Sequence, residues 1–113
     1  MVRHYIPDAG DIAWLDFDPQ SGREQARRRP ALVLTDRSYN RASGLAVVCP
    51  LTSKRKSYPF EVPLTLDKVE GAVLADHLKS MDWEARKAEF HSKADPALLS
   101  KVRAYIAVLL RVH

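Results

Sequence analysis

Residues 10–17, GDIAWLDF, and residues 30–34, PALVL, are the two stretches that decide the fold of this 113-residue chain. The first begins at a glycine and is rich in strand-forming residues, and the second is a continuous apolar run typical of a strand buried on both faces. Between them, residues 18–22 place a proline close to a glycine, which is a turn signal. The sequence therefore predicts two strands joined by a loop.

Further short strands are predicted downstream. Residues 45–49 form a second continuous apolar run. Residues 58–64 alternate between apolar and polar side chains, but their prolines cannot donate to a sheet ladder, so this strand is expected at an edge or a bend. Residues 71–76 and 79–83 are predicted as two more strands.

The C-terminal segment is a predicted helix. Asp95 is a good N-cap, and Pro96 suits the first helical position. Apolar residues then recur at helical spacing; they are Leu98, Leu99, Val102, Ile106, Leu109 and Leu110. We therefore predict a mainly β fold in which the strands curl into a small barrel, partly covered by one amphipathic helix.

Size and composition indicate one globular domain over residues 1–113. No apolar run approaches the ~18–20 residues of a membrane span, and the N-terminus lacks the apolar stretch of a signal peptide. Cys49 is the only cysteine, which excludes an internal disulfide, and the four histidines show no metal-ligand spacing. We therefore expect a cytoplasmic protein with no membrane contact, no metal and no cofactor.

The charge is unevenly distributed along the chain. Between positions 20 and 60 there are nine basic residues and two acidic ones, a net charge of +7, whereas the rest has nine against twelve, a net charge of −3. Such asymmetry favours a local anion-binding face, although solvated loop charges would explain it equally well. The densest part is residues 20–30, where Arg23, Glu24, Arg27, Arg28 and Arg29 run directly into the second strand. Its last arginine is thereby fixed at the root of a rigid element.

Several motifs, in order and at similar spacing, are those of a known family. Gly22-x-Glu24-Gln25-x-x-x-Arg29-Pro30 follows the first strand, and Pro50-x-Thr52 follows a later apolar run. With residues 10–17, 30–34, 48–53, 58–62, 73–80 and Trp83, these motifs cover nearly the whole chain. In them the chain resembles the MazF/PemK family of toxin mRNA interferases.

The resemblance implies a five- to seven-stranded SH3-like barrel of the CcdB/MazF type, with a C-terminal helix, that forms a homodimer. It also implies a toxin of a toxin–antitoxin pair: a sequence-specific, metal-independent endoribonuclease that cuts single-stranded mRNA. By position, it gives catalytic roles to Arg29 and Thr52 and implicates Glu24. Position 28 is arginine where some relatives carry histidine, so this chain lacks any proton transfer by such a histidine.

The implied chemistry is consistent with these residue types. RNA supplies its own nucleophile, the 2′-hydroxyl, and the products are a 2′,3′-cyclic phosphate and a 5′-hydroxyl. Arg29 suits the phosphorane because its planar fork donates two hydrogen bonds and stays charged, and Thr52 adds a second donor. Glu24 is the candidate base, although an ordinary glutamate with a pKa near ~4.3 is a poor one. The general acid is not assigned.

Further residues are predicted to bind RNA because they are cationic, polar or aromatic and flank the catalytic segment. They are Phe17, Arg23, Gln25, Arg27, Arg28, Ser53, Lys54, Lys56 and Lys79. Trp14 lies in an apolar strand and is expected in the core, whereas the role of Trp83 stays open.

Two other classes of function remain. One is a CcdB-like, non-enzymatic toxin that inhibits DNA gyrase, which does not need the combination of Glu24, Arg29 and Thr52. The other is a plain SH3-like RNA-binding module, or a relative that has lost activity. For the nuclease, the expected partner is an acidic, partly disordered, MazE-like antitoxin that wraps the basic groove and covers the site.

Overall fold

The computed structural model of the chain describes residues 5–17 and 28–112. It contains seven strands: β1 (Asp11–Asp16), β2 (Arg28–Val33), β3 (Leu45–Thr52), β4 (Glu61–Leu66), β5 (Val69–Leu74), β6 (Lys79–Asp82) and β7 (Glu89–Lys93). Its helices are α1 (Arg37–Ser43), the 3-10 turn η1 (Ala75–His77) and α2 (Pro96–Leu110).

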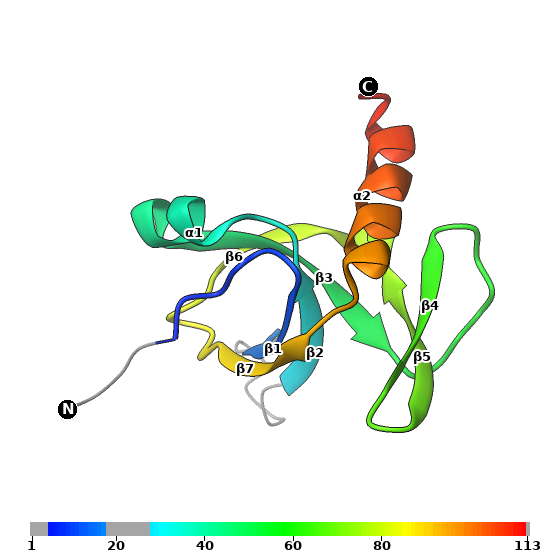
Figure 1. The fold of residues 1–113 in the computed structure, drawn as a ribbon, viewed down its shortest axis with the longest axis horizontal. Coiled ribbons are helices and arrows are strands. Elements are labelled where there is room, and N and C mark those ends of the chain that lie inside the picture. Colours follow the sequence, from blue (N-terminus) through cyan, green and yellow to red (C-terminus); the bar gives the residue numbers. More distant parts are fainter. Residues whose placement is uncertain (1–4, 18–27, 113) are drawn as a thin grey trace.

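The strands form one antiparallel sheet that curls into a half-barrel (Figure 1). Its order is β4-β5-β3-β2-β1-β7, and β6 pairs with β3 off this path. Strand β3 joins the two halves, because its first part pairs with β2 and β6 and its last two residues pair with β5. The predicted small barrel of five to seven strands with a C-terminal helix is therefore confirmed.

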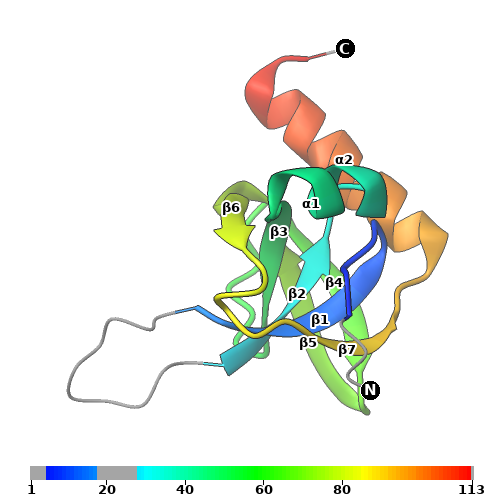
Figure 2. The same cartoon turned by 90° about the vertical axis from the view of Figure 1, so that its left-hand side faces the viewer.

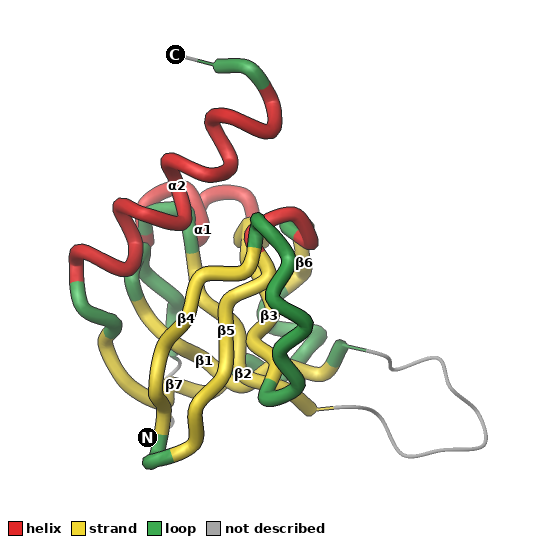
Figure 3. The backbone as a smooth tube through the Cα atoms, turned by 90° about the vertical axis from the view of Figure 1, so that its right-hand side faces the viewer, coloured by secondary structure: helices red, strands yellow, loops and turns green. Residues whose placement is uncertain are grey.

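Both faces of the sheet bury apolar side chains, as the continuous apolar runs predicted. One cluster, which includes Ile12, Leu32 and Val73, packs under α2. The other, which includes Leu15, Val33 and Val48, packs on the opposite face. Alternation along β1, β2 and β3 sends neighbouring residues to opposite clusters. Helices α1 and α2 lie toward the same end of the barrel (Figures 2 and 3).

Helix α2 begins where the sequence predicted. The side chain of Asp95 accepts a hydrogen bond from the Ala97 amide at 2.9 Å, and Pro96 occupies the first turn. Val102 is fully buried, but Leu109 and Leu110 are 39% and 56% exposed, because the last turns extend past the sheet (Figure 1). The apolar stripe is thus only partly covered by this chain.

The other predicted strands are also present, with shifted ends. β4 lies at an edge of the sheet, and its Pro63 pairs with Ala72. The sequence did not predict β7 or α1. The predicted turn at 18–22 lies outside the described residues. None of the helices in the described part is long and apolar enough to cross a membrane.

Candidate active-site cleft

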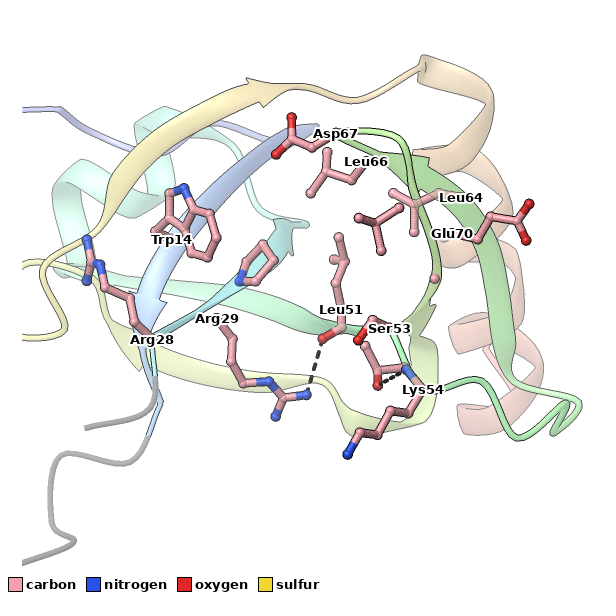
Figure 4. A pocket seen from close by; sticks show the side chains of 14 residues that line it. Trp14, Arg28, Arg29, Leu51, Ser53, Lys54, Leu64, Leu66, Asp67 and Glu70 are labelled. Atoms are coloured by element: carbon pink, nitrogen blue, oxygen red, sulfur yellow. Dashed lines mark hydrogen bonds between the residues drawn. The ribbon is translucent and has the colours of Figure 1, made fainter. Parts of the chain in front are cut away.

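A cleft of about 580 Å³ opens between β1–β3 on one side and the β4–β5 hairpin on the other (Figure 4). It is formed where β2 begins, where β3 ends and where β4 turns into β5. These three places are far apart in the sequence, and antiparallel pairing brings them to one end of the sheet. Arg28, Arg29, Thr52, Ser53 and Lys54 all line this cleft.

Arg29 is held at the root of β2 by contacts on several sides. It pairs in register with Leu15, and its Nη2 donates a hydrogen bond to the carbonyl oxygen of Leu51 at 3.2 Å. Its guanidinium carbon lies 5.5 Å from the centre of the Phe17 ring, and the Lys79 ammonium lies 5.8 Å from the same centre. Phe17 therefore supports two cations beside the cleft.

Thr52 is the last residue of β3. Its hydroxyl oxygen accepts a hydrogen bond from the Lys54 amide at 3.0 Å, and a hydroxyl that accepts keeps its own proton for donation. Gly71 crosses the Thr52 backbone so closely that a Cβ at Gly71 would clash with the Thr52 carbonyl. The absence of a side chain at position 71 thus lets β5 set the position of Thr52.

Arg28, the first residue of β2, has three hydrogen-bond partners. Its guanidinium bonds to Asp16 at 2.9 Å, to Glu89 at 3.1 Å and to the Lys87 carbonyl at 2.8 Å. These contacts tie β2 to β1 and β7, so Arg28 is partly a structural residue. The RNA contact expected of it stays a prediction.

The loop between β3 and β4 carries Lys54 and Lys56, and it is organised around Glu61. This buried carboxylate accepts hydrogen bonds from the Lys56 amide at 3.0 Å, the Ser57 amide at 3.0 Å and Arg55 Nε at 3.4 Å. The bonds from Lys56 lower the pKa of Glu61, with smaller contributions from Ser57 and Arg55, while burial opposes them. The sequence analysis missed Glu61; its only sequence signal is an acid between the apolar residues at 60 and 62.

Arg86 is a second residue that the sequence analysis missed. It lies in the turn between β6 and β7, and its Nη1 donates to the carbonyls of Asp16 and Phe17, both at 3.1 Å. Its own carbonyl accepts the Asp16 amide at 2.9 Å. Arg86 therefore fixes the end of β1, directly before residues 18–27.

Four predicted site residues, Arg23, Glu24, Gln25 and Arg27, lie outside the described residues. Trp14 is half-buried and lines the cleft, so the expectation that it belongs to the core is wrong. Trp83 donates from Nε1 to the Asn40 carbonyl at 2.9 Å and packs against the second core cluster. Within residues 5–17 and 28–112, no three His, Cys, Asp or Glu side chains are grouped as metal ligands.

A curled antiparallel barrel that gathers an arginine, a threonine and a lysine in one cleft defines a small β-barrel protein with a cationic cleft. Residues 8–110 match the family model described as PemK-like, MazF-like toxin of type II toxin-antitoxin system. The chain belongs to this family of toxins.

Individual relatives agree with this assignment. The chain is 44% identical over 110 residues to the endoribonuclease toxin MazF of Escherichia coli strain K12. The aligned part covers 97% of this chain and 99% of the relative. It is 38% identical over 95 residues to the endoribonuclease toxin ChpB of the same strain, with 79% and 81% covered. These relatives are endoribonucleases, which gives no support to the gyrase-inhibitor alternative.

Solved structures match the whole fold. MazF from Deinococcus radiodurans superposes with a TM-score of 0.86 at 49% identity, covering 96% of this chain and 100% of that one. A MazE–MazF structure from the same organism gives a TM-score of 0.84 at 44% identity, with 97% and 100% covered.

Proposed function

We propose that this chain is a toxin that cuts single-stranded RNA at specific sequences without a metal ion, and that the cleft is its active site. The observation that carries the proposal is the convergence of Arg29 and Thr52, from two strands, on one cleft. A gyrase inhibitor or a passive RNA-binding module does not need this pair. The family assignment and the endoribonuclease relatives support the same function.

The chemistry is transfer of a phosphoryl group within the RNA. The 2′-oxygen loses its proton and attacks the adjacent phosphorus, and the bond from phosphorus to the 5′-oxygen breaks. The leaving oxygen takes up a proton, so the products are a 2′,3′-cyclic phosphate and a 5′-hydroxyl. Arg29 and the Thr52 hydroxyl donate to the charge that develops on the phosphorane, where each such donor contributes about 3–4 kcal/mol.

Two residues are proposed for proton transfer, Glu24 and Arg29. Glu24 remains the proposed base, and it lies outside the described residues. Cys49 is not a candidate, because burial raises the pKa of its thiol to about 12 and it lies in the core. We propose Arg29 as a proton donor or relay, since Leu51 and Phe17 hold its guanidinium at the cleft.

The remaining predicted residues are proposed to hold the RNA backbone. Ser53 and Lys54 line the cleft next to Thr52, Lys56 lies on the same loop, and Lys79 shares the Phe17 ring with Arg29. Arg23, Gln25, Arg27 and Arg28 are proposed to extend this cationic track. Contacts of this kind position a strand without reading its sequence.

We also propose two protein partners. An acidic, MazE-like antitoxin would cover the cationic cleft, and solved MazE–MazF structures of relatives support this pairing. A second copy of the chain would cover the end of α2, where Val108 and Leu110 are 69% and 56% exposed. We also propose a cytoplasmic location, because the proposed substrate is mRNA.

The test is incubation of the purified protein with a long, defined RNA in EDTA, followed by mapping of the cut ends. We expect cuts at a recurring short sequence that leave 5′-hydroxyl ends. Arg29→Ala should abolish cutting while circular dichroism shows an unchanged fold, and Lys101→Ala, on the exposed face of α2, should cut normally. Ends with a 5′-phosphate, or cutting that persists in Arg29→Ala, would refute the mechanism.

A further inference from the structure

The cleft has two chemically different ends. Its cationic end holds Arg29, Thr52 and Lys54, which suit a phosphate. Its other end is lined by apolar side chains: Trp14, Pro30, Leu51, Leu64, Leu66 and Val69. Figure 4 shows Trp14 on one side of this end and Leu64 and Leu66 on the other. The catalytic residues account for the first end only.

The strand register couples the two ends. Trp14 pairs with Pro30 and Arg29 pairs with Leu15, so the indole and the guanidinium leave neighbouring register positions toward opposite faces of the sheet, and both reach the cleft where β2 begins (Figure 4). Val69, which also lines the cleft, is 54% exposed. Apolar groups that face each other across a concave site of about 580 Å³ fit the general form of a small-ligand pocket.

A polar group is fixed at the rim of the apolar end. Asp67 lies in the two-residue turn between β4 and β5, where it and Lys68 have φ of 53° and 66°. Its Oδ2 bonds to His91 Nε2 at 2.8 Å, and the His91 ring contacts the edge of Trp14 with a centroid distance of 5.9 Å. The carboxylate of Asp67 is therefore held near the indole across the seam between β4–β5 and β7.

We propose that this apolar end is a nucleobase subsite, which rests on the proposed ribonuclease function and adds the residues that read the sequence. A base next to the scissile phosphate packs between Trp14 and the Leu64, Leu66 and Val69 wall. Asp67 accepts a hydrogen bond from an exocyclic amino group of that base. A carboxylate only accepts, so the subsite prefers a base whose exocyclic amino group points at Asp67, such as cytosine or adenine, over uracil, which places a carbonyl oxygen where cytosine has its amino group.

An RNA base fits this end better than a segment of an acidic protein partner. The side chain of Asp67 is 68% exposed, so the rim of this end carries a carboxylate. An acidic chain would be repelled here, whereas a neutral base offers a flat apolar face and a donor. The cationic end beside it holds the phosphate of the same nucleotide, which orients the base toward Trp14.

The test is a map of cut sites on a long RNA of mixed sequence, made from the 5′-hydroxyl ends. Asp67→Asn should accept uracil at one position next to the cut, because an amide can also donate, with a change in preference of about tenfold at that position. Preferences at the other positions should stay as in the wild type. The matched control is Glu70→Gln, which removes the same charge from a carboxylate directed away from Trp14 in Figure 4; its map should be unchanged.

Binding is tested separately by fluorescence. In Trp83→Phe the remaining tryptophan, Trp14, should be quenched by an uncleavable 2′-O-methyl RNA that contains the recognised sequence. The same RNA with an abasic residue at that one position should not quench it, and in Trp14→Leu the same position should lose its preference in the cut-site map.

The outcomes separate the two proposals. A wild-type protein that cuts no RNA overturns the proposed function itself. A wild type that cuts, together with unchanged maps for Trp14→Leu and Asp67→Asn, overturns the subsite alone. Unchanged maps with weakened binding of an antitoxin peptide would identify this end as a protein-binding pocket instead, which also overturns it.

Discussion

The Arg29 guanidinium stands over the Phe17 ring, with its central carbon 5.5 Å from the ring centre, and the Lys79 ammonium approaches the same ring at 5.8 Å. One aromatic side chain thus positions a proposed catalytic cation and a proposed RNA-binding cation. Each is partly exposed to water, where such a contact contributes about 0.5–1 kcal/mol. These two contacts give a role to Phe17, the aromatic residue directly after β1.

Phe17→Leu should therefore lower kcat/KM by about two- to fivefold, since an aliphatic side chain keeps the packing but loses the attraction to cations. Phe17→Tyr retains the ring and should stay near wild-type activity. The measurement is steady-state cleavage of a short fluorogenic RNA. Equal activity of the leucine and wild-type proteins would show that the ring does not position Arg29.

Gly71→Ala should lower both stability and activity. The added methyl meets the Thr52 backbone, which cannot move aside as a side chain can, and overpacking of this kind costs about 1–3 kcal/mol. Thermal unfolding and cleavage rates check the two effects. Gly44→Ala is the control, because Gly44 has a φ of 75° but open space where a Cβ would lie. This variant should lower the melting temperature and leave cleavage intact.

The strands could be predicted from the sequence because buried strands need apolar residues, as residues 30–34 and 45–49 illustrate. β7 could not, since Glu89–Lys93 has only one large apolar residue and pairs because β1 offers it a free edge. Trp14 shows the same limit: an apolar strand predicts burial, but the residue lies where the strands part around the cleft. Charge density identified the segment of Arg28 and Arg29, but it could not show that Asp16 and Glu89 already hold Arg28.

Glu61→Gln should loosen the loop that carries Lys54 and Lys56 and weaken RNA binding. The hydrogen bonds from Lys56 lower the pKa of Glu61 in the folded state, so the charged form stabilises the fold. That contribution is fully present above the unfolded pKa of about 4.3 and is lost as the pH falls through the lower folded value. Urea unfolding at pH 7 and at pH 3 checks the sign.

The expected pattern is a stability gap between wild type and Glu61→Gln that is larger at pH 7 than at pH 3. Glu84→Gln, at an exposed position, serves as the control and should show no gap at either pH. A gap that widens toward low pH would contradict the assigned direction of the shift.

Arg86→Ala should reduce cleavage by more than its loss of stability explains. The guanidinium donates to the carbonyls of Asp16 and Phe17, and hydrogen bonds from a charged group contribute about 1.5–3 kcal/mol each. Without them the end of β1 and the Phe17 backbone lose their anchor. Arg103→Ala is the matched control, because Arg103 donates to the Leu34 carbonyl at 2.6 Å, away from the residues that line the cleft.

Both variants should melt at lower temperature than the wild type, since each loses an arginine-to-carbonyl bond. Only Arg86→Ala should lose more than about tenfold in kcat/KM, a change of about 1.4 kcal/mol in transition-state stabilisation. Arg86→Lys keeps the charge but not the planar fork, so it should recover part of the activity. Equal activity of the two alanine variants would mean that Arg86 stabilises the barrel without positioning the site.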